Sequence, residues 1–217
     1  MDKSIKKNAI IVIIIFLIAL VFRIIYIQVT PYNVRQHDLE FQNKGGGLDY
    51  IRVINETGRL PNSNKGQYYH PPLYYMSAAL WMKIISIFTR NSIIMYESLQ
   101  WQTLIYSMIL VYVLYRILVK LKFKDRYIYL ILLAIALNPT LIILSGTINN
   151  DILSVLLIFW TLLRLIKWYE KSDAKNTALL AIITGMSVMT KTSRSYVCYT
   201  YIICCNKKIC RRYKKMY

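Results

Sequence analysis

Cysteine is absent from the first 197 residues of the chain, and all four copies lie within the last twenty residues. They are Cys198, Cys204, Cys205 and Cys210. No histidine lies near them, and two adjacent cysteines are hard to aim at one ion, so their spacing fits no zinc site. We therefore assign these cysteines no chemistry.

Acidic residues are also scarce: the 217 residues include 10 Asp and Glu against 28 Lys and Arg, a formal net charge of +18. Such an excess can indicate a nucleic-acid partner. Here, however, the basic residues lie mainly in short clusters between apolar runs, as in membrane proteins with basic cytoplasmic loops. The chain is 56% hydrophobic with a mean hydropathy of +0.38. We therefore expect an integral membrane protein without a nucleic-acid partner.

The first apolar run, Asn8–Val29, is interrupted only by Arg23. At about 20 residues it can span a bilayer, and it lacks the short apolar core and small-residue cleavage site of a signal peptide. Arg23 lies near the end of the run, where its side chain can reach the interface, so we assign it no function. The basic residues before the run place the N-terminus in the cytoplasm. They are Lys3, Lys6 and Lys7.

Four further apolar runs are expected to span the membrane: Leu99–Val119, Tyr127–Leu144, Ile152–Trp168 and Asn176–Thr190. Pro139 is expected to kink the second of these. The run Leu73–Phe88 has only about 16 residues, which is short for a span. If it crossed the membrane, nine basic residues would lie outside; if it lies along the outer interface, all nine lie inside, as the charge rule prefers. The nine are Arg116, Lys120, Lys122, Lys124, Arg126, Arg164, Lys167, Lys171 and Lys175.

The predicted fold is therefore all-α: a polytopic membrane helical bundle of about five transmembrane helices. A re-entrant or interfacial helix lies in the first outer loop, residues 30–98. Residues 145–151 form a second outer loop, which contains no Lys or Arg. We expect a multi-pass protein of the cell (plasma) membrane with a cytoplasmic N-terminus and both loops outside.

The end of the chain does not fit this topology. No acidic residue follows Asp173, and the Lys and Arg cluster in residues 207–215 would lie outside, where such clusters are rare. This favours a shift of the reading frame near Thr192 or Ser193. Residues 1–192 would then be the N-terminal part of a longer protein, and residues 193–217 an atypical basic tail. The alternative is a natural tail that reaches the inner leaflet by another path.

Two acidic residues, Asp38 and Glu40, follow the first span. A carboxylate near the low-dielectric edge of a bilayer can hold a raised pKa and accept a proton from a hydroxyl group. Asp38 is therefore a candidate catalytic base, and a solvated loop acid is the alternative. His70 precedes two prolines at the start of the interfacial helix, where the helix dipole favours a phosphate. The alternative is that His70 only caps this helix.

The second outer loop ends with Asn-Asn-Asp at residues 149–151. Asp151 is a good N-cap for the helix that follows, and this role is compatible with a second one. Lys191 emerges outside after the last span, where it can meet a phosphate or serve as an interfacial anchor. The segment Gly45–Gly47 lacks the strand–loop–helix setting of a nucleotide site, and we interpret it as a flexible link.

These residues together resemble the C-type membrane glycosyltransferases, and the nearest branch is family 39, with its protein O-mannosyltransferases and aminoarabinose transferases. The resemblance rests on Asp38 in the first loop and on Tyr-His-Pro-Pro-Leu-Tyr at residues 69–74. Asn138-Pro139, the 149–151 turn and Thr190-Lys191 follow in the family's order. The resemblance covers residues 1 to about 192 and none of the tail.

The resemblance implies an enzyme that transfers a sugar from a polyprenyl-phosphate donor to a protein, lipid or glycan acceptor outside the membrane. Asp38 matches the acid that orients and deprotonates the acceptor, and His70 lies where members often carry a basic residue near the lipid phosphate. The other candidate substrate or phosphate contacts are Glu40, Tyr69, Asn150, Asp151 and Lys191. Leu39 interrupts the adjacent acid pair common in the family. Many members need no metal, and no metal or other cofactor is indicated here.

Two other interpretations stay open. The chain can be an inactive truncated remnant of such an enzyme, because the later helices of the family are missing and nothing within residues 1–190 separates the two cases. It can also be a transporter-like polytopic protein. A transporter would carry ionisable residues in mid-membrane, whereas the candidates here gather in the outer loops.

Overall fold

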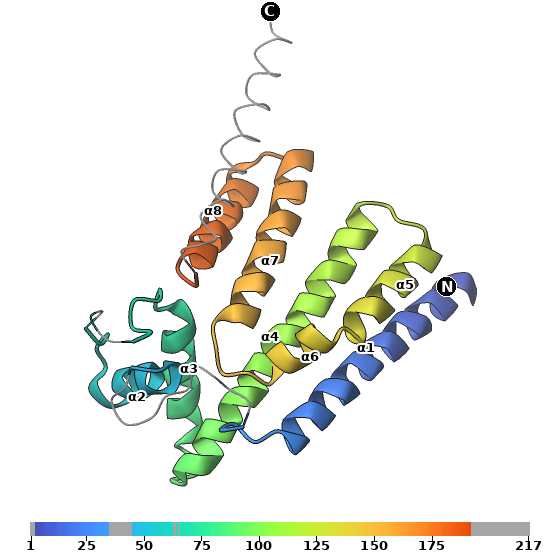
Figure 1. The fold of residues 1–217 in the computed structure, drawn as a ribbon. Coiled ribbons are helices and arrows are strands. Elements are labelled where there is room, and N and C mark those ends of the chain that lie inside the picture. The colour runs from blue at the N-terminus through green and yellow to red at the C-terminus, as the bar shows by residue number, and fades with distance from the viewer. Residues whose placement is uncertain (1–2, 35–44, 63, 65, 192–217) are drawn as a thin grey trace, which may run out of the picture.

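The computed structural model describes residues 3–34, 45–62, 64 and 66–191, and within these ranges the chain is all-helical. The prediction of an all-α bundle is confirmed. Figure 1 shows the long helices side by side, with the short helices α2 and α3 at one end. The helices are α1 (Lys3–Val29), α2 (Gly47–Thr57), α3 (Leu73–Ile85), α4 (Ser92–Lys120), α5 (Asp125–Ala136), α6 (Pro139–Ser145), α7 (Asp151–Glu170) and α8 (Ala174–Val188).

Among the described residues, three helices are long and apolar enough to cross a membrane: α1 over Asn8–Val29, α4 and α7. Helices α5 and α6 form a bent pair with an angle of 56° between them, and this pair can act as a fourth, broken span. Pro139 begins α6, so the predicted kink is confirmed. Helix α8 has 15 residues, which is shorter than a bilayer requires. Length and composition thus support three or four spans where the sequence analysis expected about five.

Two clusters of buried apolar side chains hold the bundle together. The larger joins α2, α3, α4 and α7, with Tyr75, Leu99 and Ile152 near its centre. The smaller joins α1, α4 and α5 and includes Ala19 and Val111. Helix α4 belongs to both clusters and packs against α7 on one side and α1 on the other. It is therefore the central element of the fold.

Arg23 is fully buried, so the expectation that its side chain reaches the interface is wrong. Its Nε donates to Ser107 Oγ of α4 at 2.8 Å, and its Nη1 donates to the carbonyl oxygens of Ala19 at 2.9 Å and Ala136 at 3.2 Å. Ala136 is the last residue of α5, where the helix break leaves a carbonyl without an intrahelical partner. Arg23 supplies that partner because α1 packs here against α4 and α5 rather than lipid.

Helix α2 lies within the first outer loop and was not predicted. Gly46 is its N-cap, and Gly58 ends it with a left-handed φ of 68°, a conformation that favours glycine. Tyr50 of α2 stacks on Tyr75 of α3 with 4.1 Å between ring centroids. This aromatic contact holds α2 against α3.

The glycine segment Gly45–Gly47 is buried and begins α2. The carbonyl oxygen of Gly45 accepts a hydrogen bond from the backbone N–H of Gln67 at 2.7 Å. The segment is therefore a folded helix start rather than a flexible link. Its small residues permit the close approach of the chain just before Tyr68.

Helix α4 begins at Ser92, earlier than the predicted Leu99, because the side chain of Asn91 caps it. The Asn91 oxygen accepts a hydrogen bond from the backbone N–H of Ile93 at 2.9 Å. Helix α3 ends at Ile85, before the predicted Phe88. The short connection between these two helices keeps α3 against the start of α4.

Candidate functional site

Three segments that are far apart in the sequence meet at one end of the bundle: the start of α3, the start of α7 and the end of α8 (Figure 1). The backbone N–H of Leu73 donates to the carbonyl oxygen of Met189 at 3.1 Å. The side-chain Nδ2 of Asn150 donates to the carbonyl oxygen of Thr190 at 3.0 Å. These two bonds attach both outer loops to adjacent residues at the end of α8.

An ion pair between Lys191 and Asp151 lies at this junction. Lys191 Nζ is 2.5 Å from Asp151 Oδ1, and Asn149 Nδ2 donates to Asp151 Oδ2 at 3.3 Å. The Lys191 and Asp151 side chains are 29% and 35% exposed. An ion pair this exposed contributes little to stability. It does hold a partly accessible ammonium group in a fixed place, where a ligand anion can reach it.

The N-cap of α7 is Asn150, and Asp151 is the first helical residue, so the predicted capping role of Asp151 is wrong by one position. Asn150 makes no side-chain capping bond, and its Nδ2 donates to the carbonyl oxygen of Thr190. The Asp151 carboxylate still lies in the first helical turn, where the helix dipole favours negative charge. The structure thus brings together Asn150, Asp151 and Lys191, three of the candidate residues named from the sequence.

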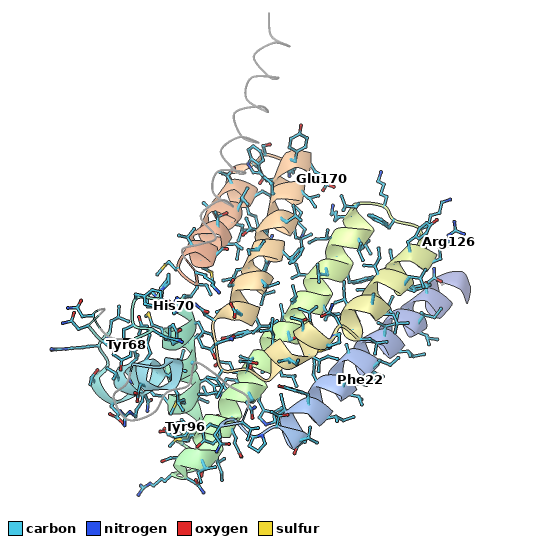
Figure 2. The ribbon with its side chains drawn as sticks, in the orientation of Figure 1. Phe22, Tyr68, His70, Tyr96, Arg126 and Glu170 are labelled. Atoms are coloured by element: carbon cyan, nitrogen blue, oxygen red, sulfur yellow. The ribbon has the colours of Figure 1, made fainter. Side chains whose placement is uncertain are left out.

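His70 lies two residues before Pro72, the N-cap of α3. Its backbone N–H donates to the carbonyl oxygen of Gln67 at 3.0 Å, and its carbonyl oxygen accepts from Tyr50 Oη at 3.4 Å. Its ring centroid is 4.3 Å from that of Tyr69, whose side chain is exposed. Figure 2 shows His70 between the α2–α3 pair and the end of α8. Two hydrogen bonds therefore hold the backbone of His70 beside α2 and α3.

The start of α3 offers fewer anion-binding amides than the sequence analysis expected. Pro71 and Pro72 have no N–H group, and the N–H of Leu73 is bound to Met189. Recognition of an anion at this end would therefore depend on side chains. His70 and Lys191 are the two candidate side chains that the structure describes there.

Asp38 and Glu40 lie outside the described residues, so the predicted base is not placed. The structure does describe Thr30, where the chain leaves α1, and Thr30 is bound by Gln100 of α4. This fully buried side chain donates through Nε2 to the carbonyl oxygens of Thr30 at 3.0 Å and Gly146 at 2.9 Å. One amide thus joins the exit of α1 to the second outer loop. The sequence analysis did not identify Gln100.

Asp49 of α2 is the buried carboxylate of the described part of the chain, and it was not singled out from the sequence. Its Oδ1 lies 3.1 Å from Arg52 Nη2, and its Oδ2 has no hydrogen-bond partner among the described atoms. The Asp and Arg three residues apart, next to Leu48 and Ile51, were the available signal for an amphipathic helix here.

Three tyrosines around α2 and α3 carry altered pKa values. Burial raises the pKa of Tyr74 well above its usual 10, and burial also raises the pKa of Tyr50. The pKa of Tyr68 is raised by burial and by the charge of Asp49, against a lowering effect of Arg52. All three hydroxyl groups are therefore neutral at physiological pH and do not act as bases. Tyr50 Oη donates to the carbonyl oxygen of His70, whereas Tyr74 Oη is buried without a hydrogen-bond partner in the described part of the structure.

Within the ranges that the structure describes, no three His, Cys, Asp or Glu residues lie close enough to hold a metal ion. The described groups at this end include two ion pairs, Lys191 with Asp151 and Arg52 with Asp49, one imidazole and a set of neutral tyrosines. Such groups can orient a phosphate and a sugar by charge and hydrogen bonds.

Residues 69–215 match the family model described as dolichyl-phosphate-mannose-protein mannosyltransferase. The matched range contains the His-Pro-Pro-Leu segment, the 149–151 turn and Lys191, whereas Asp38 precedes it. It also extends into the tail that the sequence analysis set apart, and the division at residue 192 stays a prediction. No curated protein and no solved structure matches the chain.

Proposed function

The chain belongs to the dolichyl-phosphate-mannose-protein mannosyltransferase family of membrane glycosyltransferases, and from this membership we propose transfer of a sugar from a polyprenyl-phosphate donor. The acceptor is a hydroxyl group of a protein, lipid or glycan on the extracytoplasmic side of the plasma membrane. The N-terminus is cytoplasmic in this proposal, because the basic residues at the opposite end of the bundle face the cytoplasm.

The observation that carries this proposal is the meeting of α3, α7 and α8 at one end. The bonds Leu73 to Met189 and Asn150 to Thr190 join segments from three parts of the chain. A site assembled from several distant segments is typical of binding and catalysis on a helical scaffold. The family motif at residues 69–74 enters this junction directly.

We assign the donor phosphate to His70 and Lys191. The ammonium group of Lys191 is oriented by Asp151 at 2.5 Å and remains partly exposed. Asn150 fixes the backbone of Thr190 beside it. The exposed ring of Tyr69 next to His70 supplies an aromatic surface for the sugar. Glu40 is assigned a supporting contact with the substrate.

In the proposed reaction Asp38 accepts the proton of the acceptor hydroxyl group. The hydroxyl oxygen forms the new bond to the anomeric carbon while the bond from that carbon to the phosphate oxygen breaks, with inversion. The electron pair leaves with the polyprenyl phosphate, whose negative charge Lys191 and His70 stabilise. The products are the glycosylated acceptor, polyprenyl phosphate and a protonated Asp38.

The test is transfer of radiolabelled sugar from its polyprenyl phosphate in membranes that contain the full chain. We expect Asp38→Asn to lower the transfer rate by about 100-fold or more, the usual contribution of a general base. Glu170→Gln is the matched control, because the Glu170 carboxylate forms an ion pair with Lys120 at the opposite end of the bundle. Membrane insertion of both variants is checked by carbonate extraction.

Two outcomes would overturn the proposal. Transfer by Asp38→Asn at the wild-type rate would remove Asp38 as the base. Failure of the wild-type chain to transfer sugar from any polyprenyl-phosphate donor would show that this chain is an inactive member of the family.

A further inference from the structure

Four cations lie together where α4 and α7 end, at the opposite end of the bundle from the candidate site. Arg116 and Lys120 are four residues apart on α4, and Arg164 and Lys167 are three residues apart on α7, so each pair shares a helix face. Helices α4 and α7 pack against each other. Repulsion from Arg164, Arg116 and Lys120 acts on Lys167, which places all four in one cationic cluster.

The described residues provide little compensation for this charge. Lys120 pairs with Glu170 at 2.6 Å, and Arg116 Nη1 donates to the hydroxyl group of Tyr112 at 2.7 Å. Arg164 Nε is buried and has no hydrogen-bond partner in the described part of the structure. A buried guanidinium donor without an acceptor is costly, and an anionic acceptor satisfies it best.

The charge rule for membrane topology explains why cations occur at this end, but it does not explain their grouping. Lys122, Lys124 and Lys175 satisfy the rule while fully exposed to solvent. The four residues of the cationic cluster are instead half-buried, and Lys167 is both partly desolvated and repelled by Arg164, Arg116 and Lys120. Like charges held together in a partly desolvated place are unfavourable unless an anion lies among them.

An apolar groove between α1 and α4 lies next to the cationic cluster. It has a volume of about 450 Å³ and opens toward the surroundings of the bundle. Tyr112 belongs to both features: its ring lines the groove, and its hydroxyl group binds Arg116. The groove is lined by Val12, Ile13, Phe16, Leu17, Leu20, Met108, Tyr112 and Tyr115.

We propose that the groove and the cationic cluster together bind one anionic phospholipid of the surrounding bilayer. One acyl chain lies in the groove, and the headgroup phosphate lies among Arg116, Arg164 and Lys167. Within a bilayer a groove of this composition is filled by hydrocarbon rather than water. Basic pockets between membrane helices are suited to anionic headgroups, and arginine binds phosphate through two nitrogens. A free phosphate ion has no acyl chain to fill the groove, and a zwitterionic lipid has no net negative charge to offset the cationic cluster.

The test uses the full chain in nanodiscs of phosphatidylcholine with increasing fractions of phosphatidylglycerol. Retained lipid is measured by native mass spectrometry, and the unfolding temperature is followed in parallel. We expect the wild type to retain one phosphatidylglycerol and to unfold at a higher temperature as its fraction increases. Inorganic phosphate at millimolar concentration should not reproduce this effect.

The double variant R164Q/K167Q should lower the affinity for phosphatidylglycerol by roughly tenfold to thirtyfold, as expected for two cations near a lipid phosphate. The matched control K124Q/K175Q removes the same charge from exposed positions and should keep the affinity. Equal losses in both variants would show diffuse surface charge only and overturn the proposal. Equal retention of phosphatidylcholine and phosphatidylglycerol by the wild type would also overturn it.

Two further measurements guard against misfolding and test the groove. In pure phosphatidylcholine R164Q/K167Q should unfold at or above the wild-type temperature, because its mutual repulsion is reduced. If it does not fold, Lys167→Gln alone is used, with several-fold weaker phosphatidylglycerol retention expected. Leu17→Trp fills the groove without altering charge and should also weaken retention. Unchanged retention in Leu17→Trp would overturn the placement of the acyl chain.

Discussion

The buried amide of Gln100 determines the relative position of two loops. Its single nitrogen donates to the carbonyl oxygens of Thr30 and Gly146, which lie 70 and 46 residues away in the sequence. Both loops carry candidate site residues. At the residue scale, Gln100 therefore ties the exit of α1 to the loop that precedes α7.

We predict that Gln100→Ala lowers the free energy of unfolding by about 2–4 kcal/mol, because two buried carbonyl groups lose their donor and a cavity remains. The measurement is reversible unfolding in mixed micelles with increasing denaturing detergent.

Gln102→Ala is the matched control on the same helix. Gln102 makes one described hydrogen bond, to Tyr106 Oη at 2.8 Å, and its Oε1 has none in the ranges described. We expect Gln102→Ala to lower the free energy of unfolding by less than Gln100→Ala does. Equal decreases in the free energy of unfolding would contradict the role of the two hydrogen bonds from Gln100 to the carbonyl oxygens of Thr30 and Gly146.

Residue roles that depend on distant partners were not predictable from the sequence. Arg23 looked like an interfacial cation, and its burial follows from Ser107 and Ala136, which lie 84 and 113 residues later in the chain. Asp49 looked like one of several loop acids, and its burial follows from the packing of α2 on α3. By contrast, Lys191 and Asp151 were candidates from the sequence, because Lys191 follows the last predicted span and Asp151 ends the 149–151 turn.

At the element scale, α8 depends on the cap at its start. The side chain of Asp173 accepts a hydrogen bond from the backbone N–H of Asn176 at 2.8 Å. This hydrogen bond, together with Lys171, lowers the pKa of Asp173 below its usual 3.8. A lowered pKa means that the folded state favours the ionised form. The stabilisation is therefore present above pH 3.8 and is lost as the pH falls through the lowered value.

We predict that Asp173→Ala increases hydrogen exchange of the first-turn amides of α8 at neutral pH, because the cap is lost. Asp173→Asn keeps an acceptor oxygen and should retain the protection from hydrogen exchange. Because asparagine does not titrate, this protection should not decrease at low pH. Protection that is the same in wild type and Asp173→Ala would contradict the capping role.

The elements set by uninterrupted apolar runs were predicted, and those set by local polar contacts were not. Helices α1, α4 and α7 follow from length and hydropathy, and Pro139 marked the break before α6. Helix α2 was missed because its apolar residues occupy only one face of 11 residues in a polar stretch. Helix α7 begins at Asp151, one residue before the predicted Ile152, and the bond from the Asn150 side chain to the carbonyl oxygen of Thr190, 40 residues later, had no signal in the local sequence.

At the scale of the whole molecule, the helix ends form two chemically different faces. One end holds the candidate site, and the other holds most of the described basic residues, including the cationic cluster. In the proposed topology these ends lie on opposite sides of the membrane.

We predict that single cysteines introduced by Asn62→Cys and Lys122→Cys react with a membrane-impermeant maleimide from opposite sides. The four natural cysteines are first replaced by serine. Both positions are exposed, one between α2 and α3 and the other between α4 and α5. Labelling of both from the same side would overturn the topology.

The most direct test of the central claim is to map where the full chain contacts the phosphate of a lipid-linked sugar. The probe is a polyprenyl-phosphate sugar with a photoreactive group next to the phosphate, used in membranes with excess phosphatidylglycerol to occupy other anionic-lipid sites. We predict crosslinks in the peptides around His70, Asp151 and Lys191, all reduced by unlabelled donor. Crosslinks confined to the opposite end, around Lys122, would contradict the account.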